Sequence, residues 1–271
     1  WSANTLLQDK YHKLLLDTHL DFIKAGAEVI VTTTFTTRKT RLKDNGVEDK
    51  FEHLNKKAGE IAQKAKKIYP DILIAGGLPP QFLTYEADTR PDEQIKDDFY
   101  SQAKLLNPYI DFFYLDVLSS VKEFKIAIDS IKEFKKPYLI GAHISEGTKL
   151  PSGEKISDII DIIDRQTLLG IILSCISPEN YDLNLNEIKN LGIPFGFKLN
   201  AFLKTNPKPN YTGAYKKSKT GNPNEFLGQR KDLTPEKMSE FAKKFKDAGA
   251  TILGGCCETR PSHIKKMSEL K

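Results

Sequence analysis

Short apolar runs alternate along the chain with longer amphipathic segments. The apolar runs are strand-sized and rich in β-branched residues, and they predict seven strands, at residues 27–35, 71–78, 111–118, 137–145, 170–177, 194–201 and 250–255. The segments between them carry apolar residues at helical spacing and predict eight helices, at residues 6–26, 51–68, 91–107, 120–134, 155–167, 185–192, 234–249 and 260–270. Capping signals agree, since Gly26 closes the first helix and Thr234 opens the seventh ahead of a proline.

This order of elements predicts a parallel α/β fold. A strand-then-helix rhythm implies parallel strands joined by right-handed crossovers, which an open doubly wound sheet would also satisfy. The sequence has no Gly-x-Gly-x-x-Gly after the first strand and no Walker-type loop, the usual motifs of a nucleotide-binding sheet. Eight helices with seven strands, beginning with a helix, favour a (β/α)8 TIM-type barrel whose first strand is missing from this sequence. We expect residues 1–271 to form one such domain.

Composition narrows the class of protein further. The 41 basic and 36 acidic residues are interleaved along the helices, so we expect no nucleic-acid partner. No apolar run approaches the roughly 18 residues that a membrane span needs, so we expect no membrane association. Three cysteines are too few and odd in number for a secreted disulfide framework, which predicts a reducing, cytoplasmic location. The Pro-, Gly- and Asn-rich residues 203–230 predict one long loop.

All three cysteines stand at the ends of predicted strands. Cys175 ends the strand at 170–177, and Cys256 and Cys257 follow directly after the strand at 250–255. In a parallel barrel the carboxyl ends of the strands share the catalytic face, so the three thiols are expected to converge there. Three thiolates suit a zinc ion and leave its fourth position open, as in a catalytic site. His143 and His263 are weaker candidates for a fourth ligand.

The glycines before the cysteine pair fit the same hypothesis. Adjacent residues of a flat strand point to opposite faces, so Cys256 and Cys257 can share one ion only if the backbone twists. Gly254 and Gly255 are expected to permit that twist.

Two cysteine motifs carry a resemblance to a known family. The stretch GGCCETRPSHI resembles the C-terminal zinc signature of the homocysteine S-methyltransferase family, and SCISPEN resembles its upstream single-cysteine motif. Three further stretches are similar to parts of the family's barrel. Its second strand is resembled by HLDFIKAGAEVIVTTTF, its third by IAGGLPP, and its fourth strand with the following helix by DFFYLDVLSSVKEFKIAI. The similarity spans essentially the whole chain.

The resemblance implies a zinc-dependent barrel enzyme that methylates the thiol of homocysteine to give methionine. Carried over residue by residue, Cys175, Cys256 and Cys257 would be the zinc ligands. A free thiol has a pKa of about 8.5 and is a poor nucleophile at neutral pH, whereas zinc deprotonates a bound thiol. S-methylmethionine and S-adenosylmethionine are the donors that the resemblance suggests. A betaine donor would need an aromatic cage, for which Tyr211, Tyr215, Phe226, Phe82 and Tyr85 are candidates.

Three positions depart from the family pattern near the expected amino-acid pocket. The family commonly has Glu-Thr, Asn and Thr-Asn-Thr where this chain has Asp116-Val117, Ser174 and a threonine run centred on Thr33. Asp116 keeps a carboxylate that could receive the amino group of an amino-acid substrate. Ser174 and Thr33 keep hydrogen-bonding capacity, and we expect all three to bind substrate.

These departures leave other functions open. The acceptor could be a different thiol or a selenol, or the protein could bind zinc or a thiol without turnover. A redox pair formed by Cys256 and Cys257 is a further alternative, but it leaves Cys175 unexplained.

Overall fold

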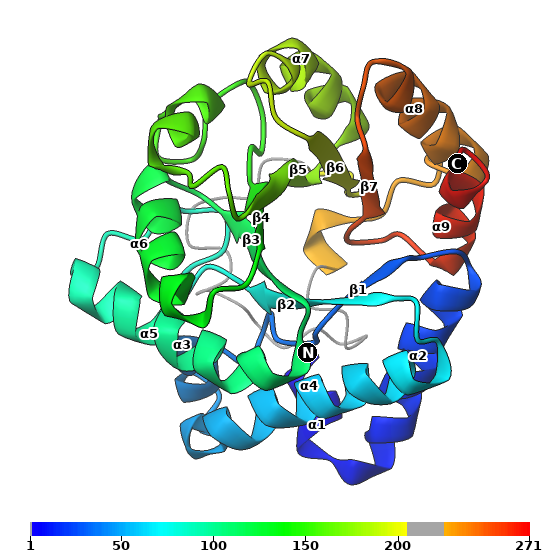
Figure 1. The fold of residues 1–271 in the computed structure, drawn as a ribbon. Helices are drawn as coiled ribbons and strands as arrows, with labels where there is room; N and C mark the ends of the chain where they lie inside the picture. The colour runs from blue at the N-terminus through cyan, green and yellow to red at the C-terminus, as the bar shows by residue number, and fades with distance from the viewer. Residues whose placement is uncertain (1, 205–224) are drawn as a thin grey trace.

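Seven parallel strands form a curled sheet in the computed structural model, which describes residues 2–204 and 225–271. The strands pair in the order of the sequence, and helices surround them on the outside (Figure 1). They are β1 (Val29–Val31), β2 (Leu73–Leu78), β3 (Phe112–Leu118), β4 (Tyr138–Ala142), β5 (Leu168–Ile176), β6 (Phe195–Leu199) and β7 (Ile252–Gly255). Each neighbouring pair is parallel, as in Ile30 beside Ile74 and Phe113 beside Tyr138. The predicted seven-stranded barrel-type α/β fold is therefore confirmed.

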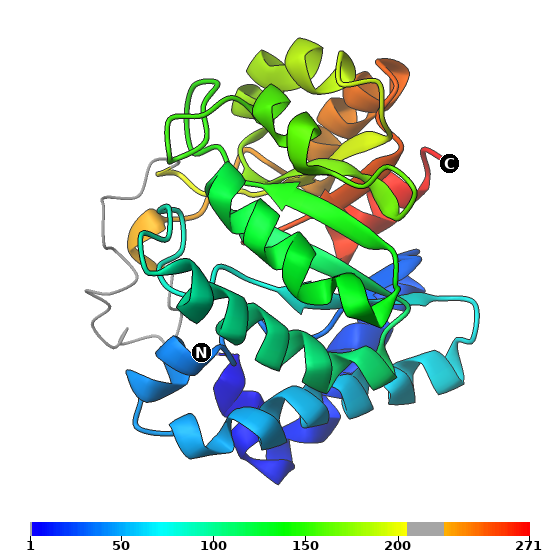
Figure 2. The ribbon, with the colours of Figure 1, turned by 60° about the vertical axis from the view of Figure 1, so that its left-hand side comes forward.

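Most helices lie where the apolar pattern predicts them, whereas α3 (Lys39–Lys43) and most of α1 (Ala3–Leu7) were not predicted. The α-helices of the described residues are α1 (Ala3–Leu7), α2 (His12–Lys24), α3 (Lys39–Lys43), α4 (Phe51–Ile68), α5 (Asp92–Leu106), α6 (Val121–Ile131), α7 (Pro178–Lys189), α8 (Pro235–Asp247) and α9 (Pro261–Ser268). Short 3-10 helices are η1 (Asp9–Tyr11), η2 (Glu48–Lys50), η3 (Asn107–Tyr109), η4 (Lys132–Phe134), η5 (Ile156–Ile162) and η6 (Glu225–Leu227). Helices α4, α5 and α6, cyan to green, run side by side along the outside of the sheet (Figure 2).

The strand expected at 27–35 is shortened to β1, and three of the predicted helices differ clearly from the structure. The helix expected at 6–26 is divided into α1, η1 and α2, because Gln8 has an extended backbone. The helix expected at 155–167 is instead the 3-10 helix η5, in which Ile156 and Ile159 are buried at the three-residue spacing of such a helix. Helix α7 begins at Pro178, seven residues earlier than expected, because the Ser177 hydroxyl caps it by accepting from the backbone N–H of Asn180.

The central strands β3 and β4 are buried on both faces, and the two faces of the sheet have different roles. Along β3, Phe113 and Leu115 pack outward among the helices, in the large core cluster. Phe112 and Tyr114 point the other way, into a smaller apolar cluster inside the curl. Burial on both faces is the condition of parallel strands covered by helices, and it fixes which residues reach the interior. Residues at the carboxyl ends of the strands therefore meet at one end of this interior.

Part of the chain lies outside this description. Residues 205–224, within the loop expected at 203–230, are not among the described residues. In the described residues, no helix combines the length and apolar character needed to cross a membrane.

Candidate metal and acceptor site

The three cysteines converge at the carboxyl ends of β5 and β7. The Sγ atom of Cys257 lies 3.8 Å from that of Cys175 and 3.8 Å from that of Cys256. All three sulfur atoms lie within 4.8 Å of one another, and they form the only group of three or more potential metal ligands found among the described residues. None of the three is in a disulfide, and Cys175 is buried. The convergence predicted from the strand ends is therefore present.

A bulge at the end of β5 turns Cys175 toward the other thiols. The pairing of β5 with β6 shifts between Ser174 and Ile176, so Cys175 is the extra residue. Its φ of 56° lies in the left-handed region, where a non-glycine residue is strained. The bulge lets two successive side chains face the interior, since Ser174 contacts Tyr114 there and Cys175 contacts Cys257.

The backbone that brings Cys256 and Cys257 together differs from the predicted one. The strand ends at Gly255, so Cys256 and Cys257 lie in the turn and not in a flat strand. Neither Gly254 nor Gly255 has a positive φ, so the expected use of glycine freedom was wrong. Gly255 is instead required for close packing, because a Cβ atom there would overlap the Thr259 hydroxyl. That hydroxyl donates to the carbonyl oxygen of Cys256 at 2.6 Å and holds the turn closed.

Neither histidine considered as a fourth ligand belongs to the cysteine group. His143 is buried, with Nδ1 3.1 Å from the Ser174 carbonyl and Nε2 2.7 Å from the Ser145 hydroxyl. Burial lowers the pKa of His143 to about 4, so its ring is neutral. His263 accepts from the backbone N–H of Arg260 and contacts the Leu233 carbonyl, so it fixes the start of α9.

The close packing of the three thiols shifts their pKa values in different directions. The pKa of Cys175 lies well below its ordinary value, chiefly because hydrogen bonds with Cys256 and Cys257 favour its thiolate. The hydrogen bond to Cys175 in turn raises the pKa of Cys256 to about 12, and hydrogen bonds to both other thiols raise that of Cys257. Thiols must lose their protons to bind a metal ion, so a divalent cation would replace these hydrogen bonds between the sulfur atoms.

Tyr85 covers one side of the cysteine group. Its hydroxyl is 3.0 Å from the Sγ of Cys175, and its ring lies 4.3 Å from that of His143, centroid to centroid. Tyr85 has a φ of 69°, so its loop, residues 79–91, is bent sharply at the point of contact. Sequence reasoning proposed Tyr85 only as a member of an aromatic cage and missed this contact.

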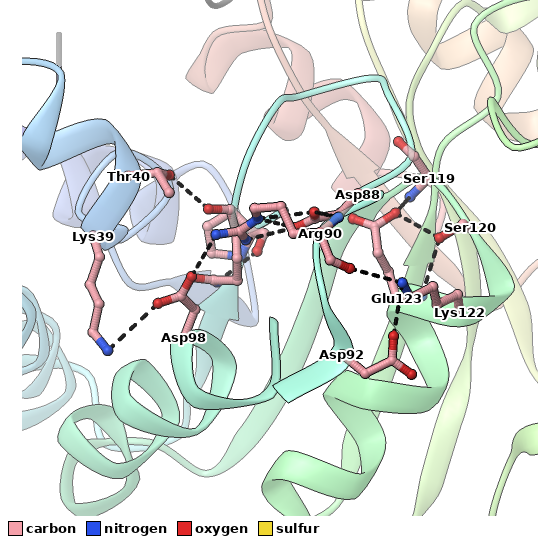
Figure 3. A network of polar contacts seen from close by, with 12 residues as sticks. Lys39, Thr40, Asp88, Arg90, Asp92, Asp98, Ser119, Ser120, Lys122 and Glu123 are labelled. Carbon is pink, nitrogen blue, oxygen red and sulfur yellow. Dashed lines mark hydrogen bonds and ion pairs between the residues drawn. The ribbon is translucent and has the colours of Figure 1, made fainter. Parts of the chain in front are cut away.

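A network of charged side chains anchors the same loop (Figure 3). Arg90 bridges two acidic residues, lying 2.7 Å from Asp88 of the loop and 2.9 Å from Asp98 on α5. Close by, Glu123 on α6 accepts hydrogen bonds from Ser120 and from the backbone of Ser119. The network therefore fixes the end of the loop that delivers Tyr85 to the cysteines.

Among the described residues, the other aromatic candidates do not form a cage that could hold a quaternary amine. Tyr211 and Tyr215 lie outside the described residues. Phe82 is 41% exposed and packs against the Arg90 guanidinium at 5.1 Å, and Phe226 is 46% exposed.

Beside the cysteines, a layer of polar side chains crosses the inside of the sheet. Lys198 on β6 forms an ion pair with Asp116 on β3, with 2.6 Å between Nζ and Oδ1. Tyr114 and Ser174 join the same layer through their hydroxyl groups, 2.5 Å apart. Burial raises the pKa of Asp116, against the opposing attraction of Lys198. Sequence reasoning missed Lys198, although a lysine inside the apolar strand FGFKL was the available signal.

Two of the three predicted substrate residues face a common cavity. A cavity of about 200 Å³ is lined by Thr33, Asp116, Phe35, Gly77 and Pro79, among others. Phe35 also packs against the cluster that contains the cysteines, so the cavity and the thiols are neighbours. Ser174 is fully buried behind Tyr114 and is not among the lining residues.

The sequence matches a known family over nearly its whole length. The family model described as homocysteine S-methyltransferase matches residues 1–270. The chain belongs to the homocysteine S-methyltransferase family. Membership places the chain among methyltransferases and confirms the family resemblance predicted from the two cysteine motifs.

Relatives of the family cover most of this chain at low identity. It is 24% identical to the selenocysteine methyltransferase of Astragalus bisulcatus, over 98% of this chain and 84% of that protein. It is 22% identical to the homocysteine S-methyltransferase of Escherichia coli, over 97% of this chain and 86% of that protein. The metallated form of the Escherichia coli homocysteine methyltransferase MmuM superposes with a TM-score of 0.80 at 19% identity, covering 100% of this chain and 88% of that one. The structural likeness supports the fold.

Proposed function

We propose that this protein transfers a methyl group to the thiol of homocysteine, giving methionine, at a zinc ion held by Cys175, Cys256 and Cys257. The observation that carries the proposal is the convergence of all three cysteines of the sequence at one end of the curled sheet. Family membership supports the reaction class. The location that fits free cysteines is the cytoplasm, and it stays a prediction.

The cysteine group fits zinc in both geometry and chemistry. Thiolates bound to tetrahedral zinc at about 2.3 Å lie about 3.8 Å from one another. The two Sγ separations of 3.8 Å match that value. Three protein ligands leave a fourth position for a substrate sulfur, and zinc, when bound, would keep that sulfur deprotonated.

The surrounding residues would position the acceptor. Asp116 and Thr33 line the cavity beside the thiols, so their carboxylate and hydroxyl groups would face the substrate, as the sequence predicts. Ser174 would act through Tyr114, whose hydroxyl it contacts, and we propose a supporting role for it. Tyr85 would close the side of the site at Cys175 and exclude water there.

The donor that suits this site is a sulfonium, S-methylmethionine or S-adenosylmethionine. Three thiolates around a zinc dication carry a net charge of about −1, and a bound substrate thiolate adds to it. Methyl transfer from a cationic sulfonium to an anionic thiolate neutralises both partners, which a site shielded from water favours.

A selenol is the second candidate acceptor. The observation that favours it is the 24% identity to the selenocysteine methyltransferase of Astragalus bisulcatus. A homologue that binds zinc or a thiol without turnover is the remaining alternative.

Methionine formation tests the proposed function directly. Zinc-loaded, reduced protein is incubated with homocysteine and either S-methylmethionine or S-adenosylmethionine, and methionine is quantified by mass spectrometry. We expect turnover with at least one donor and loss of turnover in Cys256→Ser. A parallel assay with selenocysteine in place of homocysteine tests the selenol as acceptor. Methionine from neither donor, despite bound zinc, would favour the non-catalytic alternative.

A further inference from the structure

The carboxylate of Asp116, which lines the cavity, is already paired with the ammonium group of Lys198. Strands β4 and β5 separate β3 from β6, so the lysine side chain extends across the interior to reach the carboxylate. The side chains are only 8% and 16% exposed, so water screens the pair weakly. The Lys198 ammonium also lies 4.9 Å from the centre of the Tyr114 ring.

The pair changes what the cavity offers to an acceptor. Asp116 is the one acidic side chain among the lining residues described, and its Oδ1 is already 2.6 Å from an ammonium group. An α-ammonium group entering the cavity would meet the attraction of Asp116 and the repulsion of Lys198 together. The two effects oppose each other, so the amino group of an amino-acid thiol would add little to binding.

We infer that Lys198 sets the acceptor specificity of this protein by neutralising Asp116, so that the site accepts short aliphatic thiols with or without an α-amino group. The inference rests on the proposed function, since it concerns the acceptor of that reaction. Lys198 is a specificity-determining residue and takes no part in the transfer itself.

Paired acceptors test the inference. 4-Mercaptobutanoate is homocysteine without its amino group, and the binding of both to zinc-loaded protein is measured by calorimetry at pH 8. We expect the two dissociation constants of the wild type to agree within about threefold. In Lys198→Met the carboxylate of Asp116 is freed, and homocysteine should then bind at least about tenfold more tightly than 4-mercaptobutanoate.

Two further variants make the test specific. Lys66→Met removes another lysine of a part-buried ion pair, 2.7 Å from Asp111, and should leave the ratio of the two affinities unchanged. In the double variant Lys198→Met with Asp116→Asn both charges are gone, and the ratio should return to the wild-type value. Zinc content shows whether each variant retains the folded site.

Each result decides a different claim. A wild-type preference of about tenfold or more for homocysteine would overturn the inference without any variant, as would an unchanged ratio in zinc-containing Lys198→Met. Either result would leave the proposed function standing. Failure of the zinc-loaded wild type to bind either thiol would overturn the proposed function and the inference with it.

Discussion

Cys175 and Val117 both have a left-handed backbone, at φ values of 56° and 65°, although neither is glycine. Each is the extra residue of a bulge, one at the end of β5 and the other at the end of β3. Such conformations cost on the order of 1–3 kcal/mol each and persist where the surrounding structure enforces them. Each bulge lets two successive residues face the interior. They are Asp116 and Val117 at the end of β3, and Ser174 and Cys175 at the end of β5.

Gly255 packs closely against Thr259 in the turn that carries Cys256 and Cys257. We expect Gly255→Ala to displace Thr259 and with it the turn that carries Cys256, since the new Cβ atom would lie 3.0 Å from the Thr259 Cβ and overlap its hydroxyl. The free energy of unfolding should fall by about 1–3 kcal/mol, and zinc affinity should fall with it. Chemical denaturation and competition with a zinc chelator measure the two effects.

Gly254 supplies the matched control for that substitution. A Cβ atom there would meet the Phe197 carbonyl oxygen at 3.5 Å, an ordinary contact. Gly254→Ala should therefore leave stability and zinc affinity near the wild-type values, and equal effects of the two substitutions would contradict the account of the turn.

Among the elements, helix α6 carries a buried acidic group next to the loop that delivers Tyr85. Burial raises the pKa of Glu123 to about 7, and the nearby Asp88 carboxylate adds to the effect. One oxygen of Glu123 and the hydroxyl of Ser119 are buried without a hydrogen-bond partner in the structure. A protonated Glu123 carries no charge, so burial costs the carboxylic acid less than the carboxylate.

The sign of the resulting pH effect follows from the direction of the shift. The folded state holds the proton of Glu123 more tightly than the unfolded chain, so the stabilising contribution is complete below about pH 4.5 and is lost as the pH rises through about 7. Between pH 4.5 and 8 we expect Glu123 to account for a fall of about 3 kcal/mol in the free energy of unfolding. Urea denaturation across that range should show a smaller fall in Glu123→Gln.

The exposed Glu133, in η4 just after α6, serves as the comparison. Glu133→Gln should keep the wild-type dependence of stability on pH. A pH dependence in Glu123→Gln equal to that of the wild type would show that the buried carboxyl group is not its source.

At the scale of the whole molecule, the site exists because the sheet curls. Cys175 and Cys257 are 82 residues apart in the sequence and meet because β5, β6 and β7 are consecutive neighbours that turn inward. A metal ion bound at this point joins both ends of that segment, so binding should stabilise the whole fold.

Much of this architecture could be predicted from the sequence because it depends on short-range patterns. Apolar runs located the strands, helical spacing and capping residues located most helices, and α4 (Phe51–Ile68) has its predicted bounds. The ends of strands then located the thiols, since parallel topology fixes where strand ends meet.

The remaining features depend on contacts between distant residues, which no local pattern records. The pairing of Lys198 with Asp116 requires knowing that two non-adjacent strands face each other across the interior. The left-handed conformation of Cys175 arises from a bulge in pairing with β6, and the loop of Tyr85 is placed by Arg90 and its two acidic partners.

The measurement that tests the central claim most directly is zinc per chain in the freshly purified, reduced protein, with Cys175→Ser and Cys257→Ser beside it. Tyr85→Phe is the control, since it alters the surroundings of Cys175 and leaves every thiol in place. We predict about one zinc per chain in the wild type and in Tyr85→Phe, and its loss in both cysteine variants. A wild type that holds no zinc and takes none up when zinc is supplied would contradict the account.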